Sequence, residues 1–414
     1  MGNRPGGDRV GNGTMRILLA DGDGDLLQQV RRAFWQAHRT WEVLVAATGA
    51  DALTLLGRDA VDVVIADRAL PDMDGIALLH QVRELQPGTV RIALADHAMA
   101  ELEEQADGDL HRLFLKPVTP AFLLDAMESL DIEDDETNVR AVRAFVGGLN
   151  RIPSLPSLYT DLVALLQRED AGMGEVARLV RKDLGIASQV LKLANSVHSA
   201  SDRPVSELGR AVAMLGVDSL RALVMFRGLI SGFDSPRPQG LDLEKLWFHS
   251  SQVAAGVRKL ALLEGESGLA DLAFSVGLLH DVGLVVLATD PSGRYKAILE
   301  QAQTSRVPLA VLEHQTYGVD HTQVGAHLLN LWGLPPAFCR PVREHHAPPA
   351  TAPGVGFPLS MALHLADARH GGGGMAGIFA DGRWGLHPRV MIDAERFARW
   401  KACLATDGGQ GGEA

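Results

Sequence analysis

Between residues 15 and 130, short apolar runs alternate with longer segments of helical period. The candidate strands are RILLA (16–20), EVLVAA (42–47), DVVIAD (62–67), VRIALAD (90–96) and RLFLKP (112–117). Helical patterns follow the first three runs, and a last helix is predicted from about Pro120. Short apolar runs alternating with helices are typical of parallel strands that helices cover on both faces. The pattern therefore predicts a doubly wound α/β domain with a five-stranded parallel sheet.

The pattern changes after about Val139, where strand signals nearly vanish and helical periodicity dominates, as in 176–196 and 246–263. The stretch DIEDDETN (131–138) is acidic and poor in apolar residues, which is typical of a linker. We therefore expect a disordered tail at 1–14, an α/β domain at 15–130, a linker at 131–139, an all-helical domain at 140–400 and a disordered tail at 401–414.

Composition narrows the class of protein. The 414 residues are 46% hydrophobic and 22% charged, as in globular proteins with cores. The net charge of −12 disfavours nonspecific binding to nucleic acid or to an anionic membrane, and we expect neither partner. The two cysteines have no metal-like spacing and fit a reducing compartment. No uninterrupted apolar stretch is expected to span a membrane, so the predicted location is cytoplasmic.

Acidic residues end two of the predicted strands, and a lysine ends another. Asp21 and Asp23 follow the first strand, Asp67 ends the third, and Lys116 ends the fifth. The carboxyl ends of parallel strands meet at one edge of the sheet. An acidic pocket with one lysine suits Mg²⁺-assisted phosphoryl transfer to a carboxylate. The alternative is that these are solvated loop carboxylates.

This order of elements resembles the receiver domain of bacterial response regulators, which has a flavodoxin-like fold. VVIADRALPDMDG is similar to the receiver's phosphoacceptor strand and loop, and LFLKPV to its lysine–proline turn. The resemblance implies that Asp67 is the phosphoacceptor, that Asp21 and Asp23 form an acidic Mg²⁺ pocket, and that Lys116 holds the phosphate. It also implies a sensor histidine kinase or a phosphotransfer protein as a partner.

Three positions depart from the receiver pattern. Gly22 stands where a second acid, a direct Mg²⁺ ligand, is expected; Ala95 replaces a Thr or Ser; and Leu113 replaces the aromatic switch residue. Two interpretations stay open. The domain is either weakly phosphorylated with unusual switching, or a degenerate receiver that works through partner proteins.

The run FSVGLLHDVGLVVLA (274–288) places His280 and Asp281 among apolar residues, where an unpaired charge is costly. We expect the pair on one helix, about 100° apart around its axis. Imidazole and carboxylate ligands suit Zn, Fe or Mn, in a site of one or two ions. The alternative is a polar network that fixes helix packing. The candidate ligands are His249, His280, Asp281, His321, His345, His346 and Asp367, with His364 as a competitor.

The order H…HD…H…HH…D resembles the HD phosphohydrolase superfamily. NRIPSLPSLYTDLVALL, LKLANSVHS, RAVAMLGVDSLRALV, GLLHDVGL and GVDHTQVGAHLLNLWGLP are more closely similar to the HDOD domain, the HD-related output domain of bacterial signalling proteins. The resemblance implies a response regulator of a two-component phosphorelay whose output domain binds an unidentified protein or a nucleotide. The alternative is a metal-dependent phosphohydrolase. Leu284, where many HD hydrolases have a lysine, and the missing GYP signature argue against turnover.

We predict that a nonspecific protease cleaves the full chain within 131–138, because this stretch has few apolar side chains to anchor it. Two stable fragments should then appear on a gel, and mass spectrometry should place their ends in this stretch. A single resistant fragment spanning both halves would contradict the predicted boundary.

Overall fold

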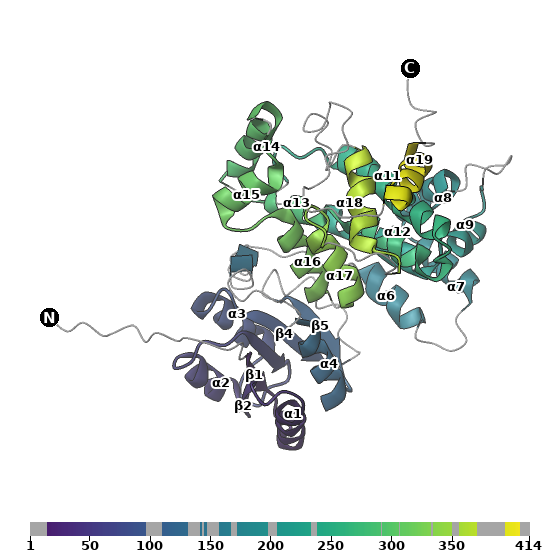
Figure 1. Cartoon of the computed structure of the whole chain (residues 1–414). Helices are drawn as coiled ribbons and strands as arrows, with labels where there is room; N and C mark the ends of the chain where they lie inside the picture. Colours follow the sequence, from purple (N-terminus) through teal and green to yellow (C-terminus); the bar gives the residue numbers. More distant parts are fainter. Residues whose placement is uncertain are drawn as a thin grey trace. The chain divides into compact units, whose positions relative to one another are not determined.

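The computed structural model describes most of the chain, in two compact units, Met1–Arg151 and Ile152–Ala414 (Figure 1). The described residues are 15–96, 110–130, 141–142, 145–146, 157–166, 172–197, 205–232, 238–290, 292–305, 307–332, 334–349, 356–370 and 394–405. The predicted tail at 1–14 and the predicted linker at 131–139 lie outside these residues.

The first unit contains the predicted five-stranded parallel sheet. Its strands are β1 (Arg16–Ala20), β2 (Glu42–Ala46), β3 (Val63–Asp67), β4 (Val90–Ala95) and β5 (Arg112–Leu115). They lie in the order β2-β1-β3-β4-β5, and each neighbouring pair is parallel. The fold class predicted from the alternating pattern is confirmed.

Helices cover this sheet on both faces. They are α1 (Gly24–Ala37), α2 (Gly49–Leu56), α3 (Gly75–Leu85) and α4 (Pro120–Leu130). The chain moves outward from β1 to β2 and then returns past β1 to β3, so right-handed crossovers place α1 on one face and α2 on the other. In agreement, α1 packs against α4, and α2 packs against α3. Leu18, Ala20, Val64 and Ala66 lie in the apolar core beneath α2 and α3.

Every element described in the second unit is helical, as predicted for this region. The helices are α6 (Ser157–Leu166), α7 (Met173–Val180), α8 (Leu184–Val197), α9 (Leu208–Leu215), α10 (Val217–Gly232), α11 (Leu243–Leu263), the short 3₁₀ helix η2 (Ser267–Leu269), α12 (Ala270–Leu279), α13 (Val282–Leu287), α14 (Arg294–Ser305), α15 (Leu309–Tyr317), α16 (His321–Leu331), α17 (Pro336–Glu344), α18 (Leu359–His370) and α19 (Ala394–Ala405).

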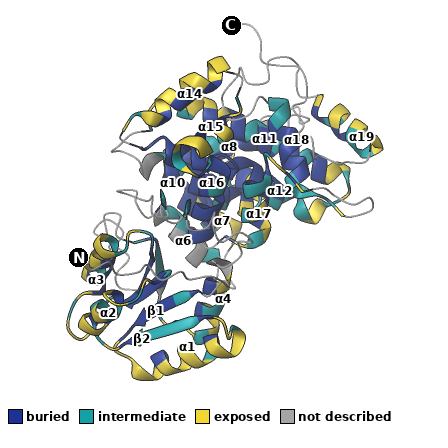
Figure 2. Cartoon of the chain, turned by 60° about the vertical axis from the view of Figure 1, so that its left-hand side comes forward, coloured by how far each residue is buried: buried dark blue, intermediate teal, exposed yellow. Residues whose placement is uncertain are grey.

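The centre of this unit is the pair α12 and α13, where α13 is buried along its whole length, whereas α14 exposes much of its surface (Figure 2). By length and composition alone, Ser267–Leu287 could span a membrane, but Asp271, His280 and Asp281 interrupt it. In addition, 83% of its most apolar window is buried inside the unit. The stretch also divides into separate helices at His280 and Asp281. This stretch is therefore part of the core of the helical unit.

Two glycines let neighbouring helices approach this centre closely. A Cβ atom on Gly277 would lie 2.6 Å from the Cα atom of Ala254 on α11. A Cβ atom on Gly283 would lie 1.9 Å from the carbonyl oxygen of His321 on α16. Any larger residue would force these helices apart, because both contacts are with backbone atoms. The glycines thus set the distances from α11 and α16 to the junction between α12 and α13.

The last described helix is held against α11 by one carboxylate. Glu264, directly after α11, accepts hydrogen bonds from Trp400 Nε1 at 2.9 Å and from Arg399 Nη2 at 2.6 Å, and Arg396 lies 3.0 Å away. The prediction of a disordered tail is wrong for residues 401–405, since α19 runs to Ala405, and residues 406–414 lie outside the described residues. The reason is amphipathicity: Trp400 and Leu404 lie one turn apart, and both are fully buried.

Glu264→Gln should weaken this attachment in a pH-dependent way. Burial raises the pKa of the Glu264 carboxyl, but Trp400, Arg396 and Arg399 outweigh burial and lower this pKa below its usual 4.5. The contribution of Glu264 to stability is therefore present above about pH 4.5 and is lost as the pH falls further. Denaturation monitored by circular dichroism should show Glu264→Gln less stable than wild type by about 1–2 kcal/mol at pH 7. The difference should shrink toward pH 3, and a constant difference would contradict this explanation.

Candidate functional site

The first unit forms a small charged pocket at the carboxyl edge of its sheet. Lys116 Nζ donates a hydrogen bond to Asp67 Oδ2 at 2.7 Å and another to Asp21 Oδ2 at 3.1 Å. Both carboxylates are more than 90% buried. Burial alone would lower the pKa of Lys116, but hydrogen bonds and charge from Asp67 and Asp21 raise it above 10.5. One ammonium group thus neutralises part of a two-carboxylate pocket.

The Asp23 side chain forms its hydrogen bonds with the start of the helix that follows it. Its Oδ1 atom caps α1 by accepting hydrogen bonds from the backbone N–H groups of Asp25 and Leu26, at 2.9 and 3.2 Å. The backbone N–H of Asp23 itself donates to Asp21 Oδ1 at 2.8 Å. Among the interactions of the described residues, none joins the Asp23 side chain to Asp67 or Lys116. Each oxygen of Asp21 accepts a hydrogen bond and keeps a second lone pair for a cation, whereas the Asp23 carboxylate is used to cap α1.

The three departures from the receiver pattern surround the same edge. Gly22 is exposed beside Asp21, and a Cβ atom there would lie 3.3 Å from the Pro71 side chain. Ala95 ends β4 and accepts a hydrogen bond from the Lys116 backbone N–H at 2.8 Å through its carbonyl oxygen. Leu113 packs against the apolar core. Position 22 therefore has room for a longer side chain after a small shift of Pro71.

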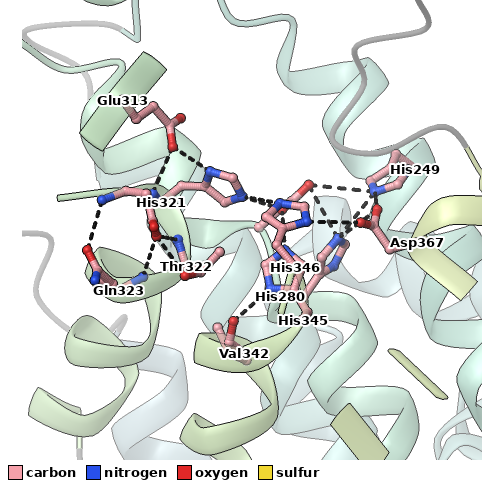
Figure 3. A network of polar contacts seen from close by, with 12 residues as sticks. His249, His280, Glu313, His321, Thr322, Gln323, Val342, His345, His346 and Asp367 are labelled. Carbon is pink, nitrogen blue, oxygen red and sulfur yellow. Dashed lines mark hydrogen bonds and ion pairs between the residues drawn. The ribbon is translucent and has the colours of Figure 1, made fainter. Parts of the chain in front are cut away.

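The second unit brings all seven predicted ligand residues into one cluster (Figure 3). They come from α11, the α12–α13 junction, the start of α16, the end of α17, and α18. Three overlapping groups have ligand atoms within 4.8 Å of one another: His249, His280 and Asp281; His321, His345 and His346; and His280, His345 and Asp367. Residues more than 100 positions apart thus share one polar centre inside an apolar helical unit.

The prediction that His280 and Asp281 lie on one helix is wrong. Helix α12 ends at Leu279 and α13 begins at Val282, so the pair forms the junction between them. Asp281 precedes α13 with φ −102° and ψ 12°, and its side chain does not cap that helix. At this junction both residues place ligand atoms in the cluster.

Hydrogen bonds on the far side of each ring orient three of the histidines. The Nδ1 atom of His280 donates to the Gly277 carbonyl at 2.8 Å, and that of His345 donates to the Val342 carbonyl at 2.7 Å. The Nδ1 atom of His321 lies 2.6 Å from the Glu313 carboxylate. With Nδ1 protonated, each Nε2 atom carries a lone pair directed into the cluster, the form in which imidazole binds a metal.

Asp281 lies between two halves of the cluster. Its Oδ2 atom is 3.3 Å from His280 Nε2 and 3.6 Å from His249 Nε2. Its Oδ1 atom is 3.6 Å from both His321 Nε2 and His345 Nε2. Buried atoms in the cluster that lack a hydrogen bond of good geometry among the described residues include Asp281 Oδ2, Asp367 Oδ1 and His345 Nε2. This donor set and its unsatisfied atoms fit one or two divalent transition-metal ions.

Without a metal, burial and neighbouring charges shift the pKa values of the cluster residues. Burial would lower the pKa of His280, but Asp281 and Asp367 outweigh burial and raise it to about 10. Burial is likewise outweighed at His321, where Glu313 and Asp281 raise the pKa to about 9. Burial and the His280 cation lower the pKa of His345 to about 4. The pKa of Asp281 stays below its usual value despite burial, because His280, His321 and His249 surround it. Ion pairing therefore compensates for the buried charges.

Sequence reasoning missed two residues of this centre. Glu313 on α15 and Tyr295 on α14 are fully buried, and the Tyr295 hydroxyl donates to Glu313 Oε1 at 2.7 Å. The only signal was a charged residue at a position of α15 that faces the core. His364, the competing ligand, donates from Nδ1 to the His345 carbonyl at 2.6 Å and is not in any of the three ligand groups found among the described residues. Leu284 is apolar and buried, so its side chain offers no positive charge to a phosphate.

Comparison with known proteins gives two family matches. Residues 17–128 match the response regulator receiver domain, and residues 152–348 match the HDOD domain. An uncharacterized protein of Treponema pallidum is 23% identical over 241 residues, covering 58% of this chain and 45% of that protein. The transcriptional regulatory protein GlrR of Escherichia coli is 27% identical over 189 residues, covering 45% of this chain and 40% of that protein.

Solved structures resemble the two units separately. An HDOD domain protein with unknown function from Geobacter sulfurreducens is 24% identical, with a TM-score of 0.48, and the match covers 66% of this chain and 97% of that chain. The signal receiver domain of an HD domain-containing protein from Pseudomonas fluorescens Pf-5 is 29% identical, with a TM-score of 0.26, and the match covers 29% and 88%.

This chain therefore contains a response regulator receiver domain followed by an HDOD domain. The receiver domain is the α/β unit that carries Asp67, and the HDOD domain is the helical unit that carries the His/Asp cluster. The chain spans less than half of the two curated relatives named above. Asp367 lies beyond the residues matched to the HDOD domain.

Asp281→Ala should destabilise the helical unit even without metal. It would leave the buried His280 imidazole without its nearest carboxylate, and breaking a buried ion pair costs about 3–5 kcal/mol. Denaturation of the full chain should be followed by circular dichroism with a chelator present. His314→Ala, on the exposed face of α15, is the control and should change stability by less than about 0.5 kcal/mol. An Asp281→Ala protein as stable as wild type would show that ion pairing does not hold the cluster.

Proposed function

We propose that this protein is a cytoplasmic response regulator that accepts a phosphoryl group on Asp67 and responds through its HDOD domain. The observation that carries the proposal is the position of Lys116, whose ammonium group lies between Asp67 and Asp21. A phosphorylated sensor histidine kinase or phosphotransfer protein would be the donor. The HDOD domain would pass the signal on by binding a partner protein or a nucleotide.

The pocket accounts for the transfer in simple steps. An oxygen of Asp67 attacks the phosphorus atom, a new O–P bond forms, and the bond to the donor breaks, leaving its electron pair on the donor. Lys116 already contacts Asp67 Oδ2 and would hold the phosphoryl oxygens in the product. Asp21 would contribute to Mg²⁺ binding, which offsets repulsion between the carboxylate and the anionic donor. Because Gly22 has no side chain and Asp23 caps α1, we expect weak Mg²⁺ binding and slow phosphorylation.

Gly22→Asp should restore a missing Mg²⁺ ligand. A carboxylate at this position should raise Mg²⁺ affinity about tenfold, which corresponds to about 1.4 kcal/mol. Labelling by acetyl phosphate should accelerate in parallel, measured by mass spectrometry of the intact chain. Asp67→Asn should abolish labelling in both backgrounds and serves as the control. Fast labelling of the wild type at low millimolar Mg²⁺ would show that the pocket is already complete.

The response to phosphorylation should also be limited by Ala95, which has no hydroxyl group to contact a phosphoryl oxygen. We expect labelling of Gly22→Asp to change hydrogen exchange in β4 and β5 only slightly. Adding Ala95→Thr should produce a clearly larger change in the same strands on labelling. A strong response without the added hydroxyl group would contradict this role for position 95.

A second candidate function is metal-dependent phosphohydrolysis in the HDOD domain. The convergence of five histidines and two aspartates favours it, because these ligands suit Zn²⁺, Fe²⁺ or Mn²⁺. His249, His280, Asp281 and Asp367 would hold one ion, and His321, His345 and His346 would hold another with Asp281 between them. Bound ions would polarise a phosphate ester and lower the pKa of a water molecule. Leu284 supplies no cation for the phosphate, which favours a binding domain over an enzyme.

Metal analysis separates these candidates. The purified full chain should contain about two transition-metal ions by inductively coupled plasma mass spectrometry, and His345→Ala should lose at least one of them. His314→Ala is again the control. Phosphate release from nucleotides that requires the metal and disappears in Asp281→Asn would establish the enzyme. A fully loaded protein without phosphate release would support the binding role, and a metal-free wild type would contradict the proposed metal centre.

A further inference from the structure

Glu313 is fully buried, and the described hydrogen bonds of its carboxylate involve two residues, Tyr295 and His321. Its Oε1 atom accepts from the Tyr295 hydroxyl at 2.7 Å. Its Oε2 atom accepts from the backbone N–H of His321 at 2.9 Å and lies 2.6 Å from His321 Nδ1. A carboxylate buried at 0% exposure is costly unless such donors compensate for the lost water. The site therefore holds Glu313 firmly, and Glu313 in turn holds His321.

The two bonds to His321 fix both its backbone and its ring (Figure 3). His321 is the first residue of α16, and Asp320 and Gln323 form a capping box that starts the helix there. The bond from Nδ1 to Glu313 places the proton on that nitrogen and turns Nε2 the opposite way. Nε2 then lies 2.9 Å from His346 Nε2 and 3.6 Å from Asp281 Oδ1. Glu313 thus determines where the lone pair of His321 points.

Only one half of the cluster depends on this arrangement. His321 and His345 lie beside Asp281 Oδ1 and form one ligand group with His346, whose Nδ1 atom is 3.8 Å from Asp367 Oδ2. His249 and His280 lie beside Asp281 Oδ2. The rings of His280 and His345 are oriented by carbonyl groups of their own helices, at Gly277 and Val342. Of these three rings, that of His321 is the one whose Nδ1 atom bonds to a side chain of another helix, Glu313 on α15.

We propose that Glu313 and Tyr295 are positioning residues for the ion held by His321, His345 and His346, and that the other half of the cluster binds its ion without them. The inference rests on the metal centre of the proposed function. Tyr295 keeps Glu313 in place, and Glu313 orients His321 and makes its imidazole a stronger ligand. Loss of such a carboxylate behind a ligating histidine typically weakens metal binding 10–100-fold.

A neighbouring pair supplies a matched control. The Tyr317 hydroxyl on α15 donates to Asp290 Oδ2 at 2.8 Å, so a second tyrosine–carboxylate contact joins α15 to the segment before α14. Asp290 also accepts hydrogen bonds from Ser292 and Arg294. Tyr317→Phe therefore removes a similar hydroxyl group from the same part of the fold and keeps the ring, whose centroid lies 6.5 Å from that of Tyr295.

The test is calorimetric titration of the chelator-treated full chain with Zn²⁺, which reports stoichiometry and the affinity of each equivalent. Wild type and Tyr317→Phe should bind two equivalents. Glu313→Gln should bind the first equivalent with unchanged affinity and the second at least about tenfold more weakly. Tyr295→Phe, which keeps the carboxylate, should weaken the second equivalent alone by a smaller factor.

Four results would overturn this inference. Equal binding of both equivalents by wild type and Glu313→Gln would show that His321 needs no positioning. A parallel loss of both equivalents would assign Glu313 a purely structural role. An effect of Tyr317→Phe equal to that of Tyr295→Phe would show that the contacts between α14 and α15 are responsible instead. If wild type itself bound no Zn²⁺, the proposed metal centre would fail first, and the inference would fail with it.

Discussion

The helical unit depends on the burial of one carboxylate. Asp281 is 2% exposed and lies among four histidine rings, where an uncompensated charge would cost several kcal/mol. Helices α11, α16, α17 and α18 must therefore approach the α12–α13 junction closely enough to place polar atoms around it. Gly277 and Gly283 permit two of these approaches, because a Cβ atom at either position would collide with a neighbouring backbone. The same close approach of the helices thus provides both packing and charge compensation in this domain.

The receiver domain solves the same physical problem with fewer groups. Asp21 and Asp67 are buried beside each other at the edge of the sheet, and Lys116 alone donates to both. The pocket is open enough for a small anion to compete for the lysine, since the Lys116 side chain is 24% exposed. The histidine cluster is more enclosed, with His346 as its partly exposed member at 37%. The two sites differ in access more than in the way they balance charge.

Residues outside the cluster connect it to further helices. Glu313 on α15 contacts His321, His364 on α18 contacts His345, and Tyr295 on α14 contacts Glu313. A change in the position of any of these helices would reach the cluster through a hydrogen bond. An ion at the centre would in turn hold those helices together, because its ligands come from separate elements. The positions of these helices and the geometry of the cluster are therefore linked.

The sequence by itself determined the local features of this protein. Short apolar runs located the five strands, and helical periodicity located the main helices. The receiver and HD-type motifs located Asp67, Lys116 and all seven residues of the cluster. These signals are readable because they depend on neighbours within a few positions. Only the tertiary structure decided that His280 and Asp281 lie at a helix junction, that Asp23 caps α1, and that Glu313 lies behind His321. Each of these depends on contacts or backbone angles set by packing, which no spacing along the chain encodes.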